Sequence, residues 1–149
     1  MANLFDPGDR QVILDRIAKL RPDSPRQWGK MNCAQALAHC SVAIEAGTGD
    51  KPRKQVFIGK IVSPFVRKGL LGDKPFPKNS PTDPAFVVSS EKDLEAERRR
   101  LMDLVNRFCE LGRENAGRQT HSFFGRMSGD EWGITMYKHI DHHLSQFGA

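Results

Sequence analysis

Apolar residues recur every three or four positions in four stretches of the chain. This spacing is typical of helices that bury one face and expose the other. Short polar residues precede these stretches, and glycines or prolines follow them, as expected at helix ends. The four predicted helices cover about residues 9–21, 32–46, 90–112 (or 90–117) and 129–146.

The predicted helix starts rest on capping signals. Asp9 precedes the first apolar stretch and Ser89 or Ser90 the third. In a capping box, a side chain before the helix and another three residues later each bind an unpaired backbone N–H. Three such boxes occur: Asn32 with Gln35, Ser90 with Asp93, and Ser128 with Glu131.

The connection between the second and third predicted helices is long and irregular. Residues 51–71 alternate between basic and apolar, which predicts one or two short helical pieces broken at Pro64. Their apolar residues are expected to face inward. Residues 72–84 contain four prolines and predict an extended strap, which is uncommon unless it covers something. The residues expected to face inward are Val56, Phe57, Ile61, Phe65, Val66 and Leu70.

These elements predict an all-α fold. Long helices joined mostly by short links favour an antiparallel four-helix bundle, with the loop-rich crossover between the second and third long helices. The sequence has no internal repeat and no visible second domain, so residues 1–149 are expected to form one domain.

The composition of the chain indicates where in the cell the protein is expected to act. No stretch approaches the roughly 18 apolar residues of a membrane span, and the N-terminus lacks a signal-peptide core. Three cysteines without a C-x-x-C pair favour reduced thiols. We therefore expect a cytoplasmic protein without a membrane partner.

Positive charge is concentrated in one segment. Residues 51–78 hold eight of the 23 Lys and Arg residues and one of the 18 acidic residues, which leaves 15 basic and 17 acidic residues elsewhere. A local basic surface suggests an anionic partner, such as a nucleic acid, a phosphate or an acidic thiol. A solvated loop that aids solubility is the favoured interpretation.

Two histidines on the last predicted helix carry the clearest chemical signal. His139 and His143 lie within about 40° of each other on one helix face, and that face holds no carboxylate. Imidazoles one turn apart can bind a metal ion from one side. Imidazole suits zinc, nickel, copper or iron, and three protein ligands that leave positions open are typical of catalytic sites.

The third ligand is predicted to be His39, which lies mid-helix among alanines that leave room around its ring. The alternative is that all three histidines are simply hydrogen-bonded in the core. Around the metal ligands, the candidates for supporting contacts are Gln35, His121, His142 and Gln146. No residue is assigned a catalytic role.

Three strings in the chain resemble the DinB/YfiT-like superfamily of metal-dependent four-helix-bundle proteins. They are WGKM with AQALAHC, the strap PFPKNSPTDP, and HSFFGRMSGDEWGITMYKHIDHHLSQFG. The last string is similar to a branch labelled a domain of unknown function. The resemblance places the metal ligands at His39, His139 and His143. In related sequences a proline often follows the histidine at position 121, whereas this chain has Ser122.

The residues and the resemblance together predict a metal-binding protein with a three-histidine site. We expect a metal-dependent enzyme that acts on a small molecule, either a hydrolase or a transferase that uses a low-molecular-weight thiol. The expected metal is zinc or nickel first and iron or manganese next. Members of the superfamily often pair as homodimers, which makes a homodimer an option for this chain. The basic segment would then guide an anionic cosubstrate. The rival prediction is a non-catalytic bundle that binds nucleic acid or another anionic partner through residues 51–78, with nucleic acid disfavoured.

Overall fold

The computed structural model describes residues 1–80 and 82–149. Residue 81, which belongs to the predicted strap, lies outside the described residues. The described part of the chain contains five α-helices: α1 (Pro7–Lys19), α2 (Cys33–Thr48), α3 (Phe57–Leu70), α4 (Leu94–Gly117) and α5 (Gly129–Gln146). Its short elements are a 3-10 turn, η1 (Pro84–Phe86), and an antiparallel hairpin of β1 (Thr120–His121) and β2 (Gly125–Arg126).

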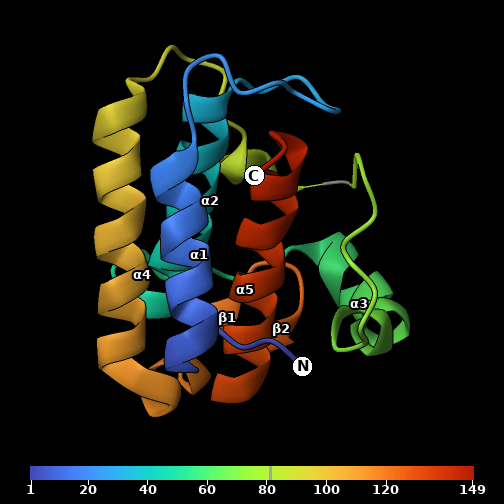
Figure 1. Ribbon diagram of the computed structural model, residues 1–149. Coiled ribbons are helices and arrows are strands. Elements are labelled where there is room, and N and C mark those ends of the chain that lie inside the picture. Colours follow the sequence, from blue (N-terminus) through green and yellow to red (C-terminus); the bar gives the residue numbers. More distant parts are fainter. Residues whose placement is uncertain (81) are drawn as a thin grey trace.

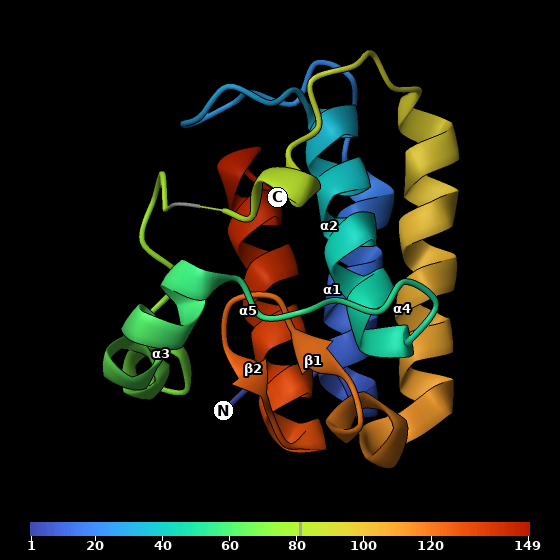
Figure 2. The same ribbon diagram turned by 180° about the vertical axis from the view of Figure 1, so that it is seen from behind.

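Helices α1, α2, α4 and α5 form an antiparallel four-helix bundle, which confirms the predicted all-α fold (Figures 1 and 2). The crossover between α2 and α4 carries α3 and η1, and α3 lies on the flank of the bundle beside α5. Within the described residues, no helix combines the length and the apolar character needed to cross a lipid bilayer.

Helix α2 is the most enclosed helix of the bundle, and small residues make this possible. Nearly all of its residues are buried, including Ala36, Ala43 and Ala46. A Cβ added at Gly47 would stand 2.7 Å from the ring of Phe108 on α4 and 3.1 Å from that of Trp132 on α5. Glycine at this position therefore lets three helices approach one another closely.

Two of the predicted capping boxes are present. Asn32 and Gln35 exchange side-chain-to-backbone hydrogen bonds of 2.9 Å at the start of α2. Ser128 and Glu131 do the same at the start of α5, which places the histidine-bearing helix in the predicted register.

The other predicted starts are wrong. Helix α4 begins at Leu94, where Asp93 rather than Ser89 or Ser90 accepts from a first-turn N–H. The carbonyls of both serines instead accept from the side chain of Gln35, which holds this segment extended along the start of α2. Helix α1 begins at Pro7, before Asp9.

The end of α4 combines both predicted stops. Gly112 has a left-handed φ of 81°, which interrupts the helix, and the helical course then resumes as far as Gly117. A positive φ is accessible to glycine at little cost, so the interruption falls where the sequence permits it.

Two predictions for residues 51–71 are wrong. Helix α3 runs unbroken through Pro64, because this proline removes only one intrahelical hydrogen bond, to the carbonyl of the exposed Lys60. Of the residues expected to face inward, Leu70 is buried and Val56 is partly covered. The other four, Phe57, Ile61, Phe65 and Val66, are exposed to solvent.

Candidate metal centre

The structure brings His39, His139 and His143 together at the interface of α2 and α5. One ring nitrogen from each lies within 4.8 Å of the other two. The Nε2 atoms of His39 and His139 are 2.9 Å apart. The three ring centroids are 4.8 to 5.0 Å from one another.

Backbone packing explains why residues one hundred positions apart can meet. His139 and His143 are four residues apart on α5, which places them one helical turn apart. On the facing helix, His39 is buried among alanines. Packing of α2 against α5 then places His39 opposite this pair.

Hydrogen bonds determine which nitrogen of His39 and of His143 is free. The Nδ1 of His39 lies 2.7 Å from the carbonyl of Phe86, and a carbonyl can only accept, so Nδ1 carries the proton. The Nδ1 of His143 donates in the same way to the amide oxygen of Gln146 at 2.8 Å. Both rings therefore present an unprotonated Nε2.

The contact between His39 and His139 follows from this assignment. Because Nε2 of His39 has a lone pair, Nε2 of His139 donates its proton to form the 2.9 Å hydrogen bond. If that proton moved to Nδ1 of His139, three unprotonated nitrogens would face one another. Neutral imidazoles in this arrangement are the form that binds a metal ion.

Burial keeps the cluster neutral. It lowers the pKa of His39, and it lowers the pKa of His139 well below the ordinary value, with the neighbouring histidines adding to the effect. Burial also lowers the pKa of His143 to about 3. Above pH 6.5 all three rings are therefore neutral. Metal binding then does not require any of them to release a proton to the solvent.

The spacing fits a metal ion. At a metal–nitrogen distance of about 2.05 Å, two ligand nitrogens stand about 2.9 Å apart at a right angle and about 3.3 Å apart at a tetrahedral angle. The separation of 2.9 Å between the His39 and His139 nitrogens lies at the lower end of this range. The donor set of three imidazoles suits a divalent transition metal, and the carbonyl and amide bonds at Nδ1 are those that ordinarily orient metal-binding histidines.

Gln146 connects this cluster to the loop that follows α1. Its amide nitrogen donates to the carbonyl of Trp28 at 2.7 Å while its oxygen accepts from His143. Gly29 adjoins it with a φ of 79°, and a Cβ at that position would stand 2.5 Å from the amide nitrogen. The loop is therefore shaped to hold this amide in one orientation.

Of the other predicted supporting residues, Gln35 makes its contacts away from the cluster and His142 lies next to it. Gln35 binds Asn32 and the carbonyls of Ser89 and Ser90 at the start of α2, so its hydrogen bonds are not made to a histidine. His142 lies beside the cluster, with its ring between Trp28 and Phe76 of the strap.

His121 faces inward from the hairpin. Its Nδ1 accepts from the backbone N–H groups of Phe123 and Phe124, both at 3.1 Å, so its Nε2 carries the proton. The ring packs against Trp132 of α5. Burial lowers the pKa of His121 to about 4.

Residues of the strap lie beside the C-terminal part of α5 and beside the loop that precedes α2. Lys78 lies over the ring of Trp28 at 4.5 Å, and Phe76 lies beside His142. Phe86, in η1, is buried and supplies the carbonyl that binds His39. The carbonyls of Phe86 and Trp28 were absent from the sequence prediction, because a backbone acceptor leaves no signature in residue types.

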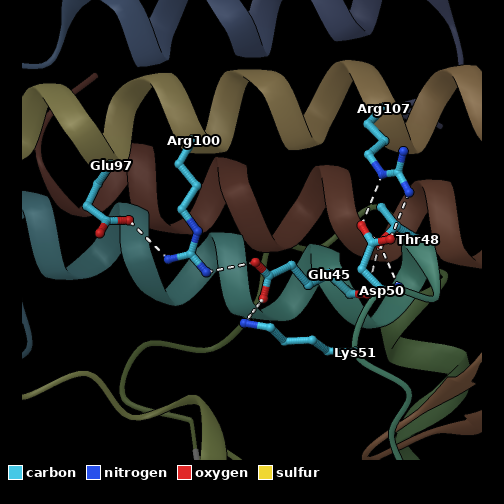
Figure 3. A network of polar contacts seen from close by, with 7 residues as sticks. All are labelled: Glu45, Thr48, Asp50, Lys51, Glu97, Arg100 and Arg107. Carbon is cyan, nitrogen blue, oxygen red and sulfur yellow. Dashed lines mark hydrogen bonds and ion pairs between the residues drawn. The ribbon is translucent and has the colours of Figure 1, made fainter.

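A network of ion pairs fixes α2, which carries His39, against α4 (Figure 3). The buried Glu45 binds Arg100 at 2.8 Å and Lys51 at 3.0 Å. Burial would raise the pKa of Glu45, but the bonds from these two cations outweigh it and lower the pKa. Just beyond the end of α2, Asp50 receives two hydrogen bonds from Arg107.

A family model described as "Protein of unknown function (DUF1569)" matches residues 5–149. The chain belongs to the DUF1569 family. This match includes all three clustered histidines and every helix of the bundle. Comparisons with curated proteins and with solved structures found no match.

Proposed function

We propose that this DUF1569 protein binds one divalent transition metal ion through His39, His139 and His143. The observation that carries the proposal is the convergence of three ring nitrogens within 4.8 Å from two helices. Their neutral state and the bonds that orient His39 and His143 support it. Imidazole ligands suit zinc, nickel, copper or iron, and we expect zinc or nickel first.

We further infer that the DUF1569 family is a branch of the DinB/YfiT-like superfamily. The helix order, the long crossover and the placement of one histidine on the second bundle helix and two on the last support this assignment. The superfamily includes enzymes that act on small molecules, so the assignment favours a hydrolase or a transferase that uses a low-molecular-weight thiol.

A bound metal ion and the residues around it would each contribute to catalysis. A bound divalent ion lowers the pKa of a water molecule or thiol that it holds. Phe86 and Gln146 hold two imidazoles in their ligating orientation. His39 is buried, whereas His139 and His143 are partly exposed. The metal-binding group in the described part of the chain contains no carboxylate, so proton transfer would fall to the bound substrate or to solvent.

The basic segment offers a specific residue for guiding an anionic substrate. Lys51 is paired with Glu45, which reduces its reach. Arg53 lies 5.0 Å from the ring centre of Phe86, whose carbonyl binds His39. The proposal therefore assigns the guiding role to Arg53 ahead of Lys51.

Metal content tests the proposal directly. Protein purified without a histidine tag should contain about one equivalent of metal by elemental analysis, and His39→Ala and His139→Ala should lose most of it. His142→Ala is the matched control, because it removes an imidazole 5.1 Å from the ring of His143 that is not part of the three-histidine group, and it should leave the metal content unchanged. Thermal unfolding with and without chelator gives a second readout.

Two results would refute the metal assignment. One is a wild-type protein that gains neither metal nor thermal stability when zinc or nickel is added after chelation. The other is equal metal content in wild-type and His139→Ala proteins, provided that circular dichroism shows the variant to be folded.

A further inference from the structure

Helix α3 exposes an unusual set of apolar side chains. Phe57 and Phe65 are 78% and 83% exposed, and Ile58 and Ile61 are more than half exposed. At about 100° per residue, these four side chains fall within about 100° on one face of the helix. They form a continuous apolar strip, which we call the α3 face.

Specific contacts hold the opposite side of α3 against the bundle. Gly59 is buried, and a Cβ there would stand 2.4 Å from the carbonyl oxygen of Phe123. The same carbonyl accepts from Gln55 at 2.9 Å, and Arg67 binds Glu131 through two hydrogen bonds. The helix therefore rests on its small and polar side, and the α3 face is left exposed to solvent.

The surroundings of the α3 face are strongly basic. Residues 51–72 contain six Lys or Arg residues and no acidic residue. Lys54, Lys60 and Lys68 are exposed, and the structure shows no ion pair for them among the described residues. An apolar strip flanked by unpaired cations is typical of helices that lie in the surface of a lipid bilayer.

We propose that the α3 face docks this protein on an anionic membrane surface. The four apolar side chains enter the boundary between headgroups and acyl chains, and Lys60 and Lys68 contact anionic headgroups. This inference does not depend on the metal site. It replaces the expectation of no membrane partner, which rested on the lack of a spanning segment.

Charge and apolar area together favour an anionic membrane over a second copy of the chain and over a nucleic acid. A second copy of the chain docked through the same face would place its lysines against those of the first, and like charges oppose such pairing. A nucleic acid would satisfy the lysines, but its phosphate backbone offers no apolar surface to cover two phenylalanines and two isoleucines. An anionic bilayer satisfies both features.

Vesicle sedimentation tests the proposal. The protein should bind vesicles of equal parts phosphatidylcholine and phosphatidylglycerol and should not bind pure phosphatidylcholine vesicles. The double variant Phe57→Ala/Phe65→Ala should weaken binding by at least about tenfold, and so should Lys60→Glu/Lys68→Glu. Val12→Ala and Lys19→Glu are matched controls on α1 and should bind like the wild type.

Three results would overturn the proposal. The first is no binding to anionic vesicles. The second is binding that the α3 variants leave unchanged while the α1 controls alter it. The third is a different occupant: a dimer in light scattering that Phe57→Ala/Phe65→Ala dissociates, or an oligonucleotide that binds more tightly than the vesicles do. Because the substituted side chains are exposed, the variants should retain the fold, and circular dichroism verifies this.

Discussion

His143 and Gln146 form a hydrogen-bonded pair in which each residue restricts the other. The imidazole Nδ1 donates to the amide oxygen at 2.8 Å, and the amide cannot flip without losing its bond to the carbonyl of Trp28 at 2.7 Å. The loop around Trp28 therefore determines the tautomer of a candidate metal ligand that lies more than one hundred residues away.

Replacing Gln146 should weaken metal binding without removing a ligand. In Gln146→Leu the Nδ1 of His143 loses its acceptor, so the ring is free to rotate and to change tautomer. We expect the dissociation constant for zinc to rise by about 10- to 100-fold in a competition titration with a chromogenic chelator. Gln11→Leu, which removes an exposed amide on α1, is the control. Equal zinc affinity in the wild type and Gln146→Leu would argue against an orienting role.

The sequence was sufficient to predict those features that depend on neighbouring residues. The boxes at Asn32 and Ser128 involve positions three residues apart, so they set the starts of α2 and α5 independently of the rest of the fold. The His139 and His143 pair follows from helix geometry alone. Once a bundle is assumed, a histidine placed among alanines is the natural partner for that pair.

Features that depend on distant contacts could not be predicted from spacing. The orientation of α3 is decided by Gly59 against Phe123, and the carbonyl that forms this contact carries no residue-specific signal. Ser89 and Ser90 are kept out of α4 by Gln35, which binds their carbonyls from a distant part of the chain. The acceptors of the histidine cluster are likewise backbone or distant groups.

His121 should make the stability of the protein depend on pH. Its pKa is lowered by burial from 6.5 to about 4, so between these pH values the unfolded state binds one more proton than the folded state. The free energy of unfolding should therefore rise with pH across this window and level off above pH 6.5, by about 1.4 kcal/mol per pH unit for this group.

The variant His121→Gln isolates this contribution. A glutamine oxygen can accept from the same backbone N–H groups but does not titrate. Urea unfolding of the two chelator-treated proteins at several pH values should give a slope smaller by about one proton in the variant. Parallel pH profiles would mean that His121 does not titrate in this window.

The ion pairs of Glu45 and Glu114 should differ in their effect on stability. Glu45 is buried between Arg100 and Lys51, so Glu45→Gln leaves poorly compensated charge between α2 and α4 and should lower the free energy of unfolding by about 2–4 kcal/mol. Glu114 pairs with Arg118 on the surface, with its side chain 83% exposed. Glu114→Gln should change stability by less than about 0.5 kcal/mol in the same urea titration. Similar losses for the two variants would indicate that burial of Glu45 adds nothing.

Gly47→Ala should couple the packing of the bundle to the metal site. Within α2, alanine is intrinsically favoured over glycine by about 1 kcal/mol. Its Cβ, however, would lie 2.7 Å from the ring of Phe108 and 3.1 Å from that of Trp132, so the helices must separate. We expect a net loss of about 1–3 kcal/mol in stability. Zinc affinity should also fall, because α2 carries His39 and α5 carries the other two ligands.

The control is Gly8→Ala on α1, where the added Cβ meets open space and should reduce neither stability nor zinc affinity. A Gly47→Ala protein that loses stability but keeps full zinc affinity would show that the spacing of α2 and α5 at the histidines is set independently of this contact.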